Sequence, residues 1–244
     1  MEFALSEEQG ILSESIKKMF DENISIDNLR DHSKGDKSLR ETIRGSIIDM
    51  GLPGLMIPEE YGGSGLGVLE ASLVAEQIGS YAVPSPWIGN SIMAPTAILF
   101  EKDNHLAEKW LPLIASGEIT ACISLSEVIG KRDDLGLTIS GDKVSGINIF
   151  GIDGELNPAI IITAVNNNLI LIETDNNGVK INEIPTIDTT RPVVEIIFDS
   201  SNYVIIPGGK EAIQKTIDVG RIGLAGDLLG ASQNMLNKAV EYSL

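Results

Sequence analysis

Apolar side chains recur every three or four positions through the first hundred residues, which is the spacing of amphipathic helices. Ser6 and Gln9 have the arrangement of a capping box, so the first helix is predicted to begin there. Gly51 follows one of the periodic stretches and stands where a left-handed residue is expected to close a helix, and a later stretch stops at Gly79. This part of the chain is therefore predicted to be helical, with four stretches defined by Leu12, Ile16, Met19 and Phe20; Leu39, Ile43, Ile47 and Met50; Leu69, Leu73, Val74 and Ile78; and Ile92, Thr96, Leu99 and Phe100.

A fifth helical stretch begins at residue 105, and Pro112 is predicted to interrupt it because proline lacks the amide hydrogen that a helix interior uses. Beyond this point the pattern changes to short runs of β-branched residues separated by turns rich in Asn, Asp and Gly. Such spacing favours antiparallel meanders that close as a small barrel or sandwich. The strand-sized runs are residues 119–125, 137–140, 143–152, 159–164, 169–174, 193–198 and 203–206.

Helical spacing returns at Lys210 and continues without a breaker to Leu244. The sequence thus predicts an α+β protein with three parts. An N-terminal all-α helical domain covers residues 1–113, an antiparallel β-barrel or sandwich domain covers residues 114–208, and a C-terminal helix that stops short covers residues 209–244. Because this last helix is apolar along one face, it needs a cover, and a homo- or hetero-oligomer is expected.

The charge of the chain narrows the possible partners. Its 244 residues contain 18 Lys and Arg against 35 Asp and Glu, a formal net charge of -17, which would repel nucleic acid phosphates and anionic lipid. One cysteine, Cys122, excludes an internal disulfide framework, and the two histidines, His32 and His105, show no metal-ligand spacing. No signal peptide and no membrane-spanning apolar run is evident, so we expect a cytoplasmic protein with no nucleic acid, membrane or metal partner.

Four glycines crowd residues 58–67, where the chain reads Pro-Glu-Glu-Tyr-Gly-Gly-Ser-Gly-Leu-Gly. Glycine is favoured where the backbone takes a positive φ or approaches another group closely, so this loop predicts either a tight turn between helices or a close approach to a bound cofactor. Glu59 and Glu60 are not expected to form a catalytic pair, because adjacent side chains point away from each other.

The order of helical block, strand block and long helix resembles the acyl-CoA dehydrogenase family, and the resemblance extends over the whole chain. Residues 58–63 resemble the acidic-glycine turn of the family's N-terminal domain, and residues 111–118 resemble the passage into its β-domain. Residues 123–127 resemble its flavin-side strand, residues 190–199 its late β-domain strand, and residues 218–242 the first helix of its C-terminal bundle. Each segment alone is a weak signal, but five in the family's order indicate membership together.

The resemblance implies α,β-dehydrogenation of an acyl-CoA thioester with FAD as cofactor. In the family, a carboxylate removes the α-proton and the β-hydrogen leaves as a hydride to the flavin, so the thioester carbonyl must be polarised and the flavin needs an apolar face. The residues placed against the flavin are Leu125, Ser126, Phe150 and Ile152. Asp218 and Arg221 are placed near the substrate, whereas without the family they read as an exposed ion pair at i,i+3.

The catalytic base of the family has no counterpart in this chain. Some members carry the glutamate directly before the arginine that matches Arg221, but Gly220 stands there and has no side chain. Other members place it later in the C-terminal bundle, beyond Leu244. No catalytic residue is therefore assigned.

The loop after Glu127 also departs from the family pattern. Lys131 and Arg132 stand beside two aspartates and are interpreted as part of a solvated turn rather than as phosphate ligands. Ile152 lacks the hydroxyl that the family's threonine directs at the flavin.

Two functions remain open at this point. The first is an acyl-CoA dehydrogenase chain that binds FAD and acyl-CoA, is incomplete alone, and passes electrons to an acceptor such as an electron-transfer flavoprotein. The second is a catalytically inactive homologue that serves as a structural or binding subunit of a hetero-oligomer. The altered loop and Gly220 favour the second, and the core pattern with Ser126 favours the first.

Overall fold

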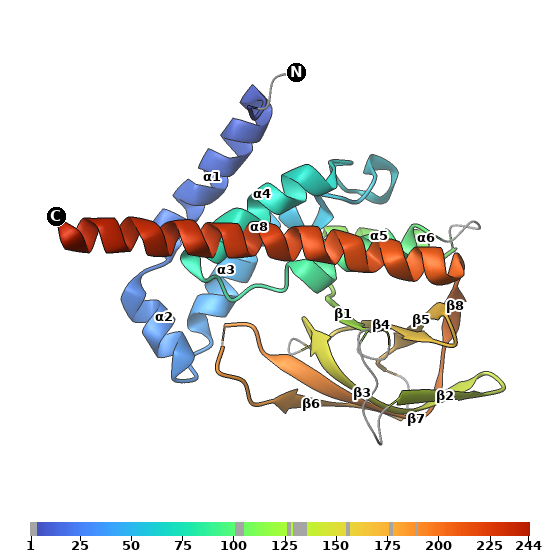
Figure 1. The fold of residues 1–244 in the computed structure, drawn as a ribbon. Coiled ribbons are helices and arrows are strands. Elements are labelled where there is room, and N and C mark those ends of the chain that lie inside the picture. Colours follow the sequence, from blue (N-terminus) through green and yellow to red (C-terminus); the bar gives the residue numbers. More distant parts are fainter. Residues whose placement is uncertain are drawn as a thin grey trace.

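The N-terminal helices cover one side of a curved sheet, and the long C-terminal helix runs beside both (Figure 1). The computed structural model describes residues 4–100, 105–125, 128, 136–154, 157–175, 178–188 and 190–244. The predicted α+β class is confirmed, since helices, then strands, then a long helix follow one another along the chain.

The N-terminal helices begin and end close to the predicted positions. Ser6 caps α1 through the predicted capping box with Gln9, and Gly51 adopts the left-handed conformation after α3. Two expectations are wrong in detail. Helix α4 continues past Gly79 and closes at Ala82, which is the left-handed residue, and Pro112 lies inside α6. The elements are α1 (Glu7–Asn23), α2 (Ile26–Ser33), α3 (Ser38–Asp49), η1 (Leu52–Gly54), η2 (Glu59–Tyr61), α4 (Val68–Tyr81), the π-helical η3 (Ile88–Met93), α5 (Ala94–Ile98) and α6 (His105–Ala115).

The strands form one sheet in the order β6-β7-β3-β1-β4-β5-β8, with β2 paired to β3. The sheet is sandwich-like rather than a closed barrel, because β6 and β8 are not paired to each other in the described residues. β1 and β4 pair in parallel, unlike the predicted antiparallel meander, and β6 was not among the predicted runs. The bounds are β1 (Ala121–Ser124), β2 (Gly136–Ser140), β3 (Lys143–Ile152), β4 (Ile160–Val165), β5 (Asn168–Glu173), β6 (Val179–Ile184), β7 (Val193–Asn202) and β8 (Val204–Ile206).

Alternate residues of the central strands enter two different cores, as the two faces of a strand require. In β4, Ile160 and Ile162 belong to the core shared with the helices, whereas Ile161 belongs to a second core within the curved sheet. Cys122 of β1 lies in this second core, where its side chain is fully buried. The sheet is thereby attached to the helical part through an apolar layer on one face.

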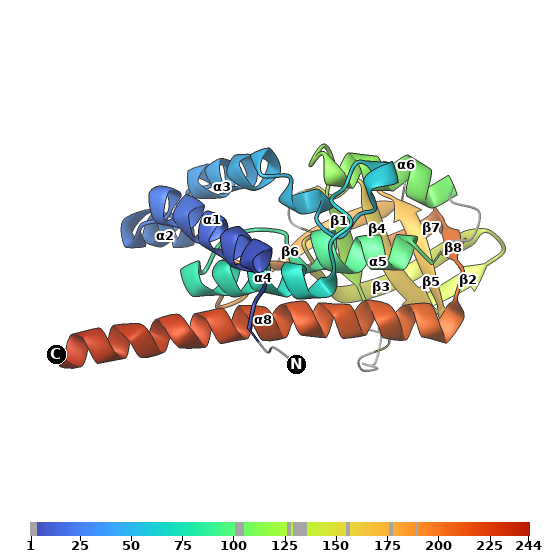
Figure 2. The same ribbon diagram turned by 90° about the horizontal axis from the view of Figure 1, so that it is seen from above.

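Helix α8 (Gly209–Ser243) lies directly against α4, and both Figure 1 and Figure 2 show its C-terminal end extending beyond the other helices. Glycines allow this close approach. A Cβ at Gly79 of α4 would lie 1.9 Å from the Asp227 carbonyl oxygen, and a Cβ at Gly230 of α8 would lie 1.8 Å from the Glu76 carbonyl oxygen. Both distances are far below van der Waals contact, so no other residue fits at either position without separating the two helices.

Among the residues with described coordinates, no helix is both long and apolar enough to cross a lipid bilayer.

We predict that Gly230→Ala lowers the free energy of unfolding by about 1–3 kcal/mol, because the added methyl group overpacks the contact between α4 and α8. The control is Gly45→Ala in α3, where a Cβ would meet nothing within 4 Å. That change should be neutral or raise stability by up to about 1 kcal/mol through helix propensity. Thermal unfolding followed by circular dichroism measures both, and equal midpoints for the two variants would contradict the close-packing model.

Candidate functional site

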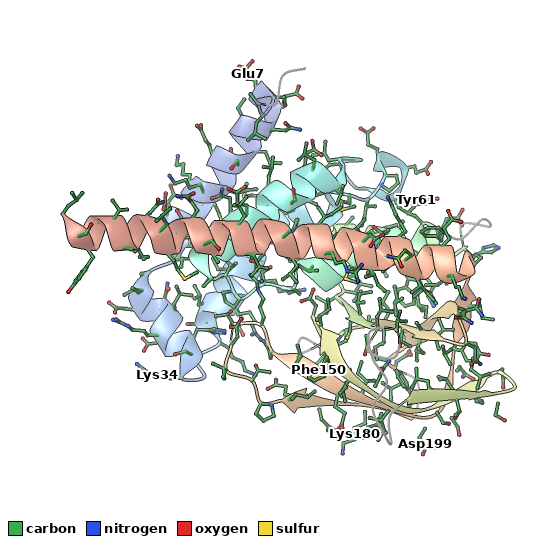
Figure 3. All side chains as sticks on the ribbon, in the orientation of Figure 1. Glu7, Lys34, Tyr61, Phe150, Lys180 and Asp199 are labelled. Carbon is green, nitrogen blue, oxygen red and sulfur yellow. The ribbon has the colours of Figure 1, made fainter. Side chains whose placement is uncertain are left out.

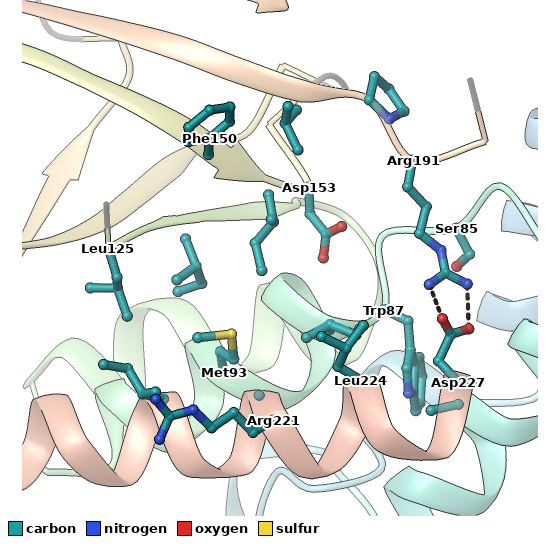
Figure 4. A pocket seen from close by; sticks show the side chains of 18 of the residues that line it. Ser85, Trp87, Met93, Leu125, Phe150, Asp153, Arg191, Arg221, Leu224 and Asp227 are labelled. Atoms are coloured by element: carbon teal, nitrogen blue, oxygen red, sulfur yellow. Dashed lines mark hydrogen bonds and ion pairs between the residues drawn. The ribbon is translucent and has the colours of Figure 1, made fainter. Parts of the chain in front are cut away.

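A cavity of about 690 Å³ lies between the sheet and α8, with α4 and η3 at its sides (Figure 4). This volume is within the range of small-molecule sites, about 300–1,000 Å³. Most of the lining is apolar. The polar side chains in it are those of Ser85, Asn148, Asp153, Arg191, Arg221 and Asp227.

The sheet side of the cavity carries three of the four residues predicted to contact a flavin. Leu125 follows β1, and Phe150 and Ile152 are in the last part of β3; all three line the cavity. Phe150 has a positive φ of 59° and is 46% exposed as a residue, so it lies at the edge of the cavity. Ser126, the fourth predicted residue, lies outside the described residues, as do Lys131 and Arg132.

The helical side carries one of the two residues predicted for the substrate. Arg221 of α8 lines the cavity, together with Ile217 and Leu224. Asp218 is not part of the lining, but its carboxylate lies 3.2 Å from the Arg221 guanidinium. Both side chains are largely exposed, so this pair by itself contributes little to stability.

Gly220 lines the cavity, and Met93 fills the space beside it. A Cβ at Gly220 would lie 2.6 Å from the Met93 sulfur and 3.0 Å from its Cγ and Cε. A carboxylate side chain would fit here only if Met93 moved aside.

A buried ion pair lies farther along α8 toward its C-terminal end, in the same cavity lining. Arg191, just before β7, forms a bidentate pair with Asp227 of α8, with 2.5 Å between Nη2 and Oδ1 (Figure 4). The Asp227 side chain is only 9% exposed and that of Arg191 is 27% exposed. Burial alone would lower the pKa of Arg191, but the hydrogen bonds and charge of Asp227, with smaller contributions from Asp153 and Asp188, raise that pKa above its usual value.

Asp153 is a further carboxylate in the cavity lining and follows directly after β3. Its Oδ2 accepts hydrogen bonds from the backbone amides of Gly89, at 2.7 Å, and Asn90, at 3.0 Å. These bonds attach the end of β3 to η3 and occupy one oxygen of the Asp153 carboxylate.

The glycine-rich loop, residues 58–67, contributes nothing to the described lining of the cavity. A Cβ at Gly63 would lie 2.0 Å from the Ile57 carbonyl oxygen, so the loop folds tightly onto the segment that follows η1. Figure 3 shows Tyr61 of this loop well separated from Phe150 of the cavity. Of the two interpretations open from the sequence, the structure agrees with the tight turn.

The sequence did not single out the pairing of Arg191 with Asp227. One signal was present, because the buried positions Gly220, Gly223, Asp227 and Gly230 share one face of α8. An aspartate among buried positions requires a partner. In the portion of the chain with assigned coordinates, no cluster of three or more potential metal ligands occurs.

Comparison with known proteins relates residues 6–118 to a family model described as the acyl-CoA dehydrogenase N-terminal domain. Over nearly the whole chain, the sequence is 26% identical to the mitochondrial isovaleryl-CoA dehydrogenase of Pongo abelii, across 265 aligned positions. The alignment covers 98% of this chain and 62% of that relative, so the chain spans about three-fifths of the relative's length.

Two solved structures share the fold. The ChsE4-ChsE5 complex from Mycobacterium tuberculosis gives a TM-score of 0.83 at 19% identity, covering 99% of this chain and 68% of that one. An acyl-CoA dehydrogenase complexed with FAD from Bacillus anthracis gives 0.82 at 17% identity, covering 98% of this chain and 44% of that one. At these identities the two structures support the fold and nothing finer.

We predict that Asp227→Ala lowers the free energy of unfolding by about 3 kcal/mol, because it leaves the Arg191 charge partly buried without its partner. Replacing both residues, as Arg191→Met with Asp227→Leu, should restore most of that loss. The control is the exposed pair: Asp218→Ala should change stability by less than about 1 kcal/mol. Urea unfolding measures all three, and equal losses for Asp227→Ala and Asp218→Ala would contradict a buried pair.

Proposed function

This chain belongs to the acyl-CoA dehydrogenase family, and from that membership we propose that its cavity binds FAD and an acyl-CoA thioester for α,β-dehydrogenation of the acyl group. One observation carries the proposal. The residues matched to the family's flavin side, Leu125, Phe150 and Ile152, and the one matched to its substrate side, Arg221, come from separate segments and line one cavity.

The lining suits these ligands chemically. Leu125 and Ile152 offer apolar surface to a flavin ring, and the exposed Phe150 adds an aromatic face at the edge of the cavity. Flavin bound there would supply the hydride acceptor for the reaction. Arg221, at the exposed end, is suited to orient an anionic or carbonyl part of the thioester ligand through its guanidinium donors.

The proton-accepting group is the part that these residues do not provide. Gly220 has no side chain, Asp227 is bonded to Arg191, and Asp153 is bonded to two backbone amides. We therefore place the base outside the described residues, on another segment or on a partner subunit. FAD binding and electron transfer to an acceptor, such as an electron-transfer flavoprotein, are parts of the same proposal.

The second candidate is a binding subunit without catalytic activity in a hetero-oligomer. The filling of the space beside Gly220 by Met93 favours it, since the family's base cannot be accommodated at that position as the chain stands. Under this candidate the cavity keeps its ligand but does not carry out proton abstraction.

The flavin spectrum separates the two candidates. The chain is purified with FAD, alone and together with the products of its neighbouring genes, and the visible flavin absorbance is recorded before and after adding acyl-CoA. Bound flavin that is bleached by acyl-CoA in any combination supports dehydrogenation. Bound flavin that never changes supports the inactive subunit, and the absence of bound flavin in every combination would contradict the proposal.

We further predict that a glutamate at residue 220 is accommodated only when Met93 is replaced by a smaller residue. Gly220→Glu with Met93→Ala should bleach bound flavin at least about a hundredfold faster than the same protein carrying Gly220→Gln, because a positioned base contributes about that much or more. Gly220→Glu alone should be destabilised by its clash with Met93. Stopped-flow absorbance measures the rates, and equal rates for the Glu and Gln proteins would rule out position 220 as a competent base site.

A further inference from the structure

The cavity has two chemically different ends along α8. Arg221, with a side chain that is 69% exposed, marks the open end, and Asp227, with 9%, marks the buried end. The two residues are six positions apart on the helix, which corresponds to about 9 Å at the rise of an α-helix. A ligand whose thioester carbonyl lies at Arg221 therefore directs the far end of a short acyl group toward Asp227.

The buried end is charged, although the walls that lead to it are apolar. Arg191 lies there with its partner Asp227, and Asp153 is a further carboxylate of the same lining. Ser85 lines the cavity at the same end (Figure 4). At this end of the cavity the Arg191 guanidinium is therefore already held by a carboxylate.

This chemistry discriminates between three kinds of acyl terminus. A carboxylate would be repelled by Asp227, which already holds the Arg191 guanidinium. A methyl terminus would displace water from the ion pair and offer no hydrogen bond in return, which is unfavourable. An uncharged hydroxyl or carbonyl avoids both penalties, because a guanidinium has five N–H donors and Asp227 uses only two of them.

We propose that Arg191 and Asp227 are specificity-determining residues, which select a short acyl group whose far end carries an uncharged hydrogen-bonding group. This inference rests on the proposed function, in which the cavity holds the acyl group of a CoA thioester. It adds the class of acyl group, which the family resemblance does not give.

Calorimetric titration of the FAD-supplemented protein with three matched thioesters tests the inference. The ligands are butanoyl-CoA, its hydroxyl-terminated analogue and succinyl-CoA, which differ only at the acyl terminus. The hydroxyl-terminated ester should bind at least about tenfold more tightly than either of the other two, as expected where a site hydrogen-bonds a substrate hydroxyl.

Two variants at the ion pair and one control show whether these residues cause the preference. Arg191→Gln with Asp227→Asn keeps the shapes, removes both charges, and should bring the three affinities to within about threefold of one another. Asp227→Asn alone leaves Arg191 unopposed by its main partner and should strengthen binding of succinyl-CoA most. Arg221→Gln, at the open end, should weaken all three esters by a similar factor.

The possible failures are distinguishable, provided that circular dichroism shows each variant to be folded. If the wild-type protein binds the three esters equally, or keeps its preference in the double variant, the specificity role is overturned while the proposed function stands. If none of the three esters binds to the wild-type protein, the proposed function fails and this inference fails with it.

Discussion

The close contact between α4 and α8 is the constraint on which the rest of the structure depends. At Gly79 and Gly230 the two backbones approach so closely that even a methyl group has no space. Because α8 forms one wall of the cavity, the separation of these helices sets the width of the cavity. A larger residue at either glycine would displace the helix that carries Arg221, Leu224 and Asp227.

A second set of contacts holds the sheet side of the cavity in place. Asp153 attaches the end of β3 to η3 through two backbone amides, and Arg191 attaches the start of β7 to α8 through Asp227. Apolar burial supplies most of the stability of such a structure, whereas these polar contacts fix which surfaces face each other. The same groups give the buried end of the cavity its charge, so one ion pair serves both the architecture and the proposed selection of the acyl group.

Much of the fold could be predicted from the sequence, because helix periodicity and turn chemistry are local. The capping box at Ser6 and the bounds of β3 and α8 are examples in which neighbouring residues decide the structure. Pro112 was misjudged since α6 tolerates it, and β6 lacks the run of β-branched residues that marks the other strands. The parallel pairing of β1 with β4 depends on the whole sheet, so local patterns did not reveal it.

From the sequence, only those residues of the candidate site that lie in family-like motifs could be predicted. Motifs supplied Leu125, Phe150, Ile152 and Arg221, but the pairing of Arg191 with Asp227 joins positions 36 residues apart and required the three-dimensional structure. The filling of the space beside Gly220 by Met93 is likewise a contact between distant segments.

Hydrogen–deuterium exchange along α8 tests the central claim that this helix is fixed by its contact with α4 and η3. Residues 216–230 contain the buried positions that face those helices, whereas the side chains of residues 235–243 are exposed. We expect protection over 216–230 comparable to that of the buried strand β4, and exchange over 235–243 at least about a hundredfold faster. Uniform exchange along the whole helix would contradict it.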